Sequence, residues 1–180
     1  MNVLQNVSKN KLLLLILKES QYLAHLSKVI KSINNSQSNI CYACLNRPYK
    51  DLIEDMKKED INFNRFFFID ILSSHYTKPK PVKNCVFIEE PIKLVNIQSA
   101  ITELVNKEKC STIIIDTIHT LLDFESSFSI TKFAHNLTIE KKDKNKIFIA
   151  LDENGFTRES AGELTKDLGM FADKVIEFKK

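Results

Sequence analysis

The chain has 180 residues, of which 43% are hydrophobic and 27% charged, and its formal net charge is +3. These values are typical of a soluble globular protein, and the length predicts one domain over residues 1–180 with a flexible polar stretch at 1–11. The small charge, without a basic loop interleaved with aromatic residues, argues against nucleic acid as a partner.

The apolar run Leu12–Leu17 is too short to cross a membrane, because about 20 apolar residues are needed to span a bilayer. Lys18 and Glu19 follow this run, where a signal peptide would have small residues and a cleavage site. We therefore expect a cytoplasmic protein that makes no contact with a membrane.

Short apolar runs alternate with amphipathic stretches in the first half of the chain. Leu12–Leu17 predicts a strand covered on both faces, and the apolar stripe Tyr22–Ile33 predicts the helix that follows it. Two more strands are expected at Ile40–Leu45 and Arg65–Leu72, with a helix over residues 49–56 between them.

The second half begins with an irregular stretch around Pro79 and Pro81, which we expect to be a mobile loop. The alternation then resumes, with strands expected at Cys85–Ile88, Thr112–Asp116, Ile147–Leu151 and Lys174–Phe178 and helices over 97–105 and 130–137. A capping box, Ser160–Glu163, is expected to open a last helix that Gly169 caps at its C-terminus. This order predicts an α/β fold with three layers, a mostly parallel sheet with helices on both faces.

The four cysteines include one C-x-x-C pair, Cys41 and Cys44, inside a predicted strand. Residues i and i+3 of a strand point to opposite faces, so these two thiols are poorly placed for one metal ion or one disulfide. Cys85 and Cys110 supply no second pair of zinc ligands, and we expect all four to be buried reduced thiols. The lysine-rich run 141–146 is expected to be a solvated loop.

Four segments carry a resemblance to a known superfamily. Thr112–Thr117 resembles the hydrophobic strand of RecA-type ATPases that ends in their metal-organising aspartate, the Walker B motif. Leu121–Phe124, Lys132–Leu137 and Leu168–Phe178 are similar to segments of the KaiC-like branch, which is common in archaea. The resemblance implies a RecA-like three-layer sheet over nearly the whole chain.

Two motifs of that superfamily are missing. Its ATPases carry G-x-x-x-x-G-K-[ST] after the first strand, whereas this chain has Lys18, Glu19, Ser20 and Gln21 there and no glycine before Gly155. The acid that activates water in these ATPases follows the second strand, where this chain has Asn46 and Arg47. We therefore expect no catalytic residue, bound metal or cofactor.

Single carboxylates remain as candidates for a vestigial nucleotide site. Asp116, with Thr117 beside it, either keeps a contact to Mg²⁺ or a ligand or is a structural carboxylate bonded to neighbours such as Thr117, and we favour the structural role. Asp70, which also ends a strand, is interpreted in the same way. Asp152 and Glu153 follow a strand and are candidates for the rim of a ligand crevice.

The remaining acids and histidines give weaker signals. Glu89 and Glu90 precede Pro91 and are expected to form a solvated turn. The four histidines are dispersed, without metal spacing, and we expect them to be structural; they are His25, His75, His119 and His135.

These observations favour a pseudo-ATPase, a RecA/KaiC-like domain that acts as a regulatory or scaffolding subunit. Its expected partner is another protein, either a second copy of the chain or an active paralogue. The alternative is an atypical ATPase that keeps Asp116 and completes its site with a neighbouring subunit, and a third hypothesis is signal transduction through a small ligand. An open crevice near 18–21, 46–47 and 116, or one filled by a side chain such as Tyr22, would separate these hypotheses.

Overall fold

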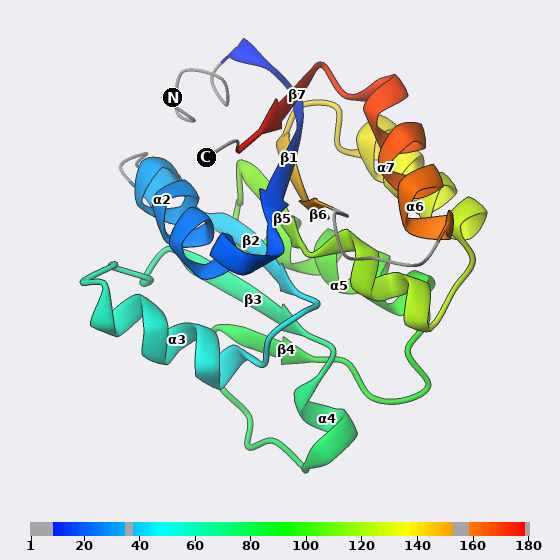
Figure 1. Ribbon diagram of the computed structural model, residues 1–180. Coiled ribbons are helices and arrows are strands. Elements are labelled where there is room, and N and C mark those ends of the chain that lie inside the picture. The colour runs from blue at the N-terminus through cyan, green and yellow to red at the C-terminus, as the bar shows by residue number, and fades with distance from the viewer. Residues whose placement is uncertain (1–8, 35–37, 153–158, 179–180) are drawn as a thin grey trace.

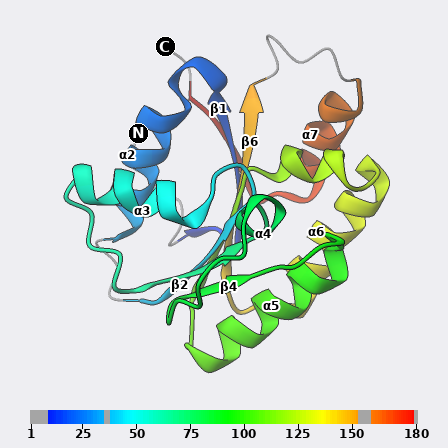
Figure 2. The same ribbon diagram turned by 90° about the horizontal axis from the view of Figure 1, so that it is seen from below.

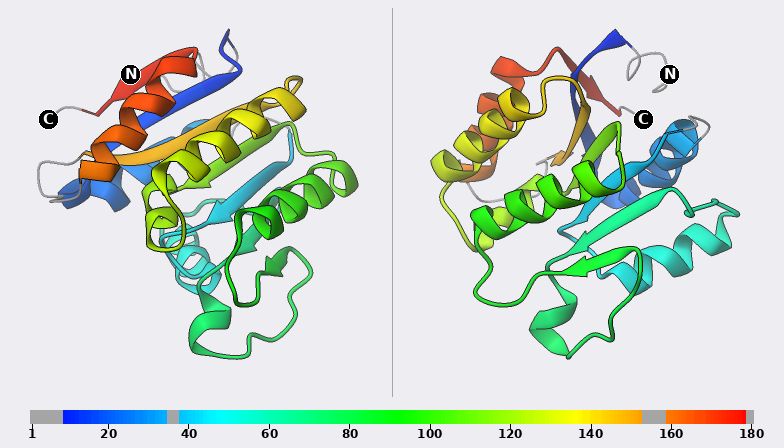
Figure 3. Two further views of the ribbon diagram at one scale, coloured as in Figure 1. Left: turned by 90° about the vertical axis from the view of Figure 1, so that its right-hand side faces the viewer. Right: turned by 180° about the vertical axis from the view of Figure 1, so that it is seen from behind.

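The structure is a computed structural model that describes residues 9–34, 38–152 and 159–178, and its centre is a seven-stranded sheet (Figure 1). The strand order is β4-β3-β2-β5-β6-β1-β7, and every neighbouring pair is parallel. The strands are β1 (Leu12–Lys18), β2 (Ile40–Cys44), β3 (Phe66–Asp70), β4 (Cys85–Phe87), β5 (Thr112–Asp116), β6 (Asn145–Asp152) and β7 (Lys174–Glu177). Figure 3 shows β4 and β7 at opposite edges of the sheet.

Helices cover both faces of this sheet, as predicted. They are η1 (Glu19–Gln21), α2 (Tyr22–Asn34), α3 (Tyr49–Lys58), α4 (Ser73–Tyr76), α5 (Leu94–Lys107), η2 (Ile118–Asp123), α6 (Ser127–Glu140) and α7 (Glu159–Phe171). Figure 2 shows α2 and α3 on one face and α5, α6 and α7 on the other. The α/β class and the three layers are therefore confirmed, and the sheet is parallel throughout.

Alternation along the strands divides the core into two halves. In β1, Leu12 and Leu14 pack with α5, α6 and α7, whereas Leu13, Leu15 and Leu17 pack with α2 and α3. All five are at most 1% exposed, because a central strand with helices on both sides buries every side chain.

The same alternation separates the two cysteines of the C-x-x-C pair, as predicted. Cys41 belongs to the core half under α5–α7 and Cys44 to the half under α2 and α3. All four cysteines are free and buried. Burial raises the pKa of each thiol, to about 11 for Cys110, so the thiols stay protonated at neutral pH.

The carboxyl ends of β2 and β5 form the point from which the chain leaves the sheet in two directions. β2 continues through α3 to β3 on one side, and β5 continues through α6 to β6 on the other. In open parallel sheets such a switch point leaves a crevice where ligands commonly bind. The structure therefore identifies the edge at Cys44 and Asp116 as the place to look for a site.

Both predictions about the ends of the last helix are wrong. α7 is already helical at Glu159, so Ser160 lies inside it and is not its N-cap. Gly169 also lies inside, because the helix continues to Phe171 and no described glycine has positive φ. A long-range contact lies where the helix ends: Oδ2 of Asp173 accepts hydrogen bonds from the backbone N–H groups of Lys11 (2.7 Å) and Leu12 (2.8 Å).

The prediction that the lysine-rich run 141–146 is a solvated loop is wrong for its last residue. Lys146 belongs to β6 and is 1% exposed. Its ammonium donates hydrogen bonds to the carbonyls of Lys141 (2.9 Å) and Lys144 (2.8 Å). The last carbonyls of a helix need donors from outside the helix, and Lys146 supplies one beyond the end of α6.

Candidate functional site

Asp116 is the centre of a buried hydrogen-bonded cluster at the carboxyl edge of the sheet. It ends β5 and is 2% exposed. Its Oδ2 accepts a hydrogen bond of 2.6 Å from the hydroxyl of Tyr22, the first residue of α2, and another of 2.6 Å from the hydroxyl of Tyr42 in β2. One carboxylate oxygen thus joins a helix to two neighbouring strands.

The predicted partner of Asp116, Thr117, is not bonded to it. Among the residues that the structure describes, Thr117 Oγ1 and Asp116 Oδ1 are both buried without a hydrogen-bond partner. The backbone carbonyl of Asp116 accepts from the N–H groups of Leu45 (2.6 Å) and Asn46 (3.3 Å). Sequence reasoning missed Tyr42, although a tyrosine inside a fully buried strand signals that its hydroxyl needs an acceptor.

Burial dominates the electrostatics of this cluster. Desolvation raises the pKa of Asp116 to about 6, although the two tyrosine hydroxyls and the charge of Arg47 act in the opposite direction. The pKa values of Tyr22 and Tyr42 are raised by burial and by the neighbouring carboxylate, so both phenols stay protonated and act as donors. In the described ranges, no three His, Cys, Asp or Glu side chains form a group that could hold a metal ion.

The connection from β1 to α2 contains no loop. β1 ends at Lys18, the single turn Glu19–Gln21 follows, and the Tyr22 N–H bonds back to the Glu19 carbonyl as α2 begins. Glu19, Ser20 and Gln21 are exposed, whereas Tyr22 is 8% exposed and fills the space beneath the helix start. The connection is therefore a tight turn above a buried tyrosine.

Asn46 and Arg47 lie directly beyond β2, next to Asp116. The Asn46 backbone is fastened to Asp116, as described above, and Arg47 Nη2 forms an ion pair of 2.6 Å with Asp55 of α3. The Arg47 guanidinium is the largest cause of the lowered pKa of Asp55. The structure thus brings two of the predicted positions, 46–47 and 116, to one place.

Asp70 has the structural role that was predicted for it. It is fully buried at the end of β3, and its two oxygens accept from the backbone N–H groups of Tyr49 (2.6 Å), Leu72 (2.7 Å) and Ser73 (2.8 Å) and from Ser73 Oγ (2.6 Å). The carboxylate therefore fastens the starts of α3 and α4 to the sheet.

The other candidates lie around this edge or beyond it. Asp152 ends β6 and is paired with Lys18 in the sheet register, whereas Glu153 lies outside the described residues. Glu89 and Glu90 are exposed as predicted, and Glu90 pairs with His75.

His119 is structural, as expected for the histidines. It is 7% exposed, with Nε2 at 2.8 Å from Thr165 Oγ1 of α7 and Nδ1 accepting from the Leu151 N–H at 3.4 Å. Burial lowers the pKa of His119 to about 4, which keeps the ring neutral.

Comparison with known proteins supports the fold. No protein-family model matches the chain, and no curated protein sequence does. The crystal structure of a KaiC-like protein from the hyperthermophilic archaeon Pyrococcus horikoshii is similar over 94% of this chain and 73% of that one, with a TM-score of 0.57 and 13% sequence identity. At this identity the likeness shows a shared KaiC-like fold and nothing about activity.

None of the helices in the described segments is both long and apolar enough to cross a bilayer.

Proposed function

We propose that this chain is a KaiC-like domain without nucleotide chemistry, which acts as a regulatory or scaffolding subunit by binding another protein. The observation that carries the proposal is the hydrogen bond from Tyr22 to Asp116. The aspartate that would organise Mg²⁺ in the ATPases is here buried and bonded to two phenols. A metal ion would have to compete with both phenols for Oδ2.

The turn above Tyr22 also opposes phosphate binding. A phosphate loop uses backbone N–H groups, a lysine and a hydroxyl, and losing three or four such charge-assisted bonds at about 1.5–3 kcal/mol each weakens binding by roughly four or more powers of ten. Glu19 adds a negative charge in the first turn, which favours the helix dipole but repels a polyphosphate.

Exposed apolar side chains at the same end of the molecule support a protein partner. Helices that follow parallel strands begin at the carboxyl edge of the sheet, and three of them expose a large apolar residue there: Tyr76 in α4, Val95 in α5 and Phe128 in α6. These side chains are 76%, 62% and 76% exposed. We take these three side chains, each on a different helix, as candidate contacts for a protein partner.

Size-exclusion chromatography with light scattering, combined with affinity capture from the native host, tests the proposal. We expect either a mass above that of one chain or a retained protein partner, lost in Phe128→Ser but kept in Ile139→Ser. Ile139 is the matched control, because it is 59% exposed at the other end of α6. A monomer that retains no partner would contradict the proposed function.

One observation favours the atypical ATPase as the second candidate. Within the described part of the chain, Asp116 Oδ1 and Thr117 Oγ1 are buried oxygens without a hydrogen-bond partner, so both are free to accept or to ligate. Titration with a fluorescent ATP analogue and Mg²⁺ separates the two candidates. Micromolar binding that Asp116→Ala weakens would support the ATPase, and the absence of saturable binding would support the proposal above.

A further inference from the structure

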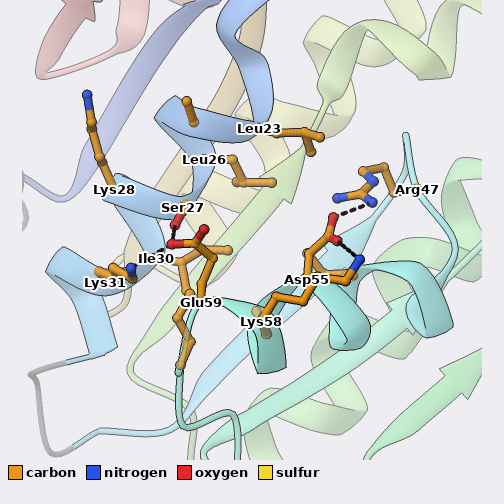
Figure 4. Close-up of a pocket in the computed structure, with 14 residues that line it drawn as sticks. Leu23, Leu26, Ser27, Lys28, Ile30, Lys31, Arg47, Asp55, Lys58 and Glu59 are labelled. Atoms are coloured by element: carbon orange, nitrogen blue, oxygen red, sulfur yellow. Dashed lines mark hydrogen bonds and ion pairs between the residues drawn. The ribbon is translucent and has the colours of Figure 1, made fainter.

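A groove of about 550 Å³ lies between α2 and α3, on the face opposite α5–α7 (Figure 4). Its lining is mostly apolar, with Leu23, Leu26 and Ile30 from α2 facing Leu52 and Met56 from α3. The volume falls in the range of small-molecule sites, and such sites combine apolar walls with a few polar groups that orient the ligand.

The charged residues around the groove are predominantly cationic. Four cations line it, Lys28, Lys31, Arg47 and Lys58, against two acids, Asp55 and Glu59. Both acids are already paired: Glu59 with Lys31 at 2.7 Å, and Asp55 with Arg47 at 2.6 Å and Lys58 at 3.3 Å. The groove therefore has an excess of positive charge and complements an anion.

The two ends of the groove differ. Glu59, which directly follows α3, links this end of α3 to α2 through an ion pair with Lys31 and through Ser27 Oγ, which donates to it at 3.2 Å. At the other end Leu23, 52% exposed, and Arg47 face each other across the space between the helices (Figure 4). We call this end, formed by Leu23 and Arg47, the mouth of the groove.

Arg47 has unused hydrogen-bonding capacity at the mouth. Its side chain is 21% exposed and Nη2 binds Asp55, whereas Nη1 is buried without a partner among the described residues. A guanidinium has five N–H donors in a planar fork that suits a carboxylate. The exposed part of the guanidinium brings its positive charge to the groove, whereas a small movement of the side chain would be needed for an anion to reach the buried Nη1.

We propose that this groove binds a free amphiphilic anion, a carboxylate with a medium-length alkyl chain, whose acid group contacts Arg47 and whose chain lies along Leu23, Leu26, Ile30 and Met56. The Glu59 link at one end and the modest volume favour a small molecule over a protein segment. The proposal does not depend on the proposed function, because the groove is not the cluster around Asp116.

Titration of the ¹⁵N-labelled chain with decanoate, below its micelle concentration, tests the proposal by following backbone amide signals. We expect saturable shifts confined to α2, α3 and residues 45–48. Two ligands serve as controls: decyltrimethylammonium has the same chain with the opposite charge, and butanoate has the same acid with a short chain. Both should bind at least roughly tenfold more weakly than decanoate.

Variants locate the site. Arg47→Gln should weaken decanoate binding by about tenfold or more, because it removes the charged donor. Leu23→Asn should weaken it without touching any ion pair, so it remains informative if Arg47→Gln fails to fold. Ile139→Asn is the control, since it alters an apolar residue of similar exposure, 59% against 52% for Leu23, on the other face.

Three results would overturn the proposal. They are equal binding of the cationic ligand, shifts outside α2, α3 and residues 45–48, and equal losses in Leu23→Asn and Ile139→Asn. Retention of a protein partner that depends on Leu23, with no binding of decanoate, would also overturn it and would assign the groove to a protein segment.

Discussion

The hydroxyl of Tyr22 donates a hydrogen bond of 2.6 Å to Oδ2 of Asp116, 94 residues further along the chain. The bond fastens the first residue of α2 to the last residue of β5 at the switch point of the sheet. Under the proposed function, this bond closes the place where an active ATPase of the resembled superfamily would hold phosphate and metal.

Removing this hydroxyl should destabilise the fold. Tyr22→Phe leaves the buried carboxylate with Tyr42 alone, and we expect the free energy of unfolding in urea to fall by about 1–3 kcal/mol. Tyr49→Phe is the control, because Tyr49 is half-buried and its hydroxyl donates to the neutral Asn84 Oδ1 at 2.9 Å. We expect this variant to lose about 0.5–1.5 kcal/mol of unfolding free energy. A larger loss for Tyr49→Phe than for Tyr22→Phe would contradict the importance given to Asp116.

Asp116 and His119 should give the stability opposite dependences on pH. The pKa of Asp116 is raised to about 6, so the native state binds its proton more tightly than the unfolded chain, and its contribution is present below pH 3.8 and lost as the pH rises through 6. The pKa of His119 is lowered to about 4, so its contribution is present above pH 6.5 and lost as the pH falls through 4.

Single variants separate the contributions of Asp116 and His119 to the free energy of unfolding, each of which is at most about 3 kcal/mol. Between pH 4 and 6, the unfolding free energy of Asp116→Asn should rise with pH more steeply than that of the wild type, because the opposing Asp116 contribution is removed while those of His119 and of His25, whose pKa burial also lowers, remain. That of His119→Gln should rise less steeply than the wild type or fall over the same window. Urea unfolding at several pH values measures the slopes, and a change of slope in the opposite direction in either variant would show that the assignment is wrong.

Gly169→Ala should stabilise the chain, contrary to what a C-cap glycine would do. Gly169 lies inside α7 without positive φ, and an added Cβ would meet Val175 Cγ2 at 3.8 Å, an ordinary contact. Alanine in a helix interior is favoured over glycine by about 0.5–1 kcal/mol. Thermal unfolding decides: a lower melting temperature for the variant would restore the sequence-based prediction.

Lys146→Met should destabilise the chain by about 1–3 kcal/mol, because the carbonyls of Lys141 and Lys144 lose their common donor. Lys142→Met, in the same run but exposed, should stay within about 0.5 kcal/mol of the wild type. Urea unfolding compares the two variants, and equal effects would mean that the whole run is solvated after all.

Hydrophobic periodicity was sufficient to predict the layers of the fold. The stripe Tyr22–Ile33 and the run Thr112–Asp116 are respectively a helix and a strand, because burial on one face or on both leaves a direct trace in the order of apolar residues. The opposite orientations of Cys41 and Cys44 follow from the same period of two.

Contacts between distant segments could not be predicted in this way. Tyr42 reaches Asp116 because β2 lies beside β5, and strand order is not written in local periodicity. The end of α7 was also misassigned, because the local pattern suggested a cap at Gly169. The helix instead continues to Phe171, and Asp173 just beyond it accepts hydrogen bonds from the amides of Lys11 and Leu12, 162 and 161 residues away. The burial of Lys146 likewise depends on carbonyls presented beyond the end of α6.

A crystal structure of the wild-type chain determined in millimolar ATP and Mg²⁺ tests the central claim most directly. The account predicts that Tyr22 remains bonded to Asp116 and that no ordered polyphosphate lies against the turn Glu19–Gln21. Ordered β- and γ-phosphates bound to the amides of Ser20 to Tyr22, with Tyr22 displaced from Asp116, would contradict it.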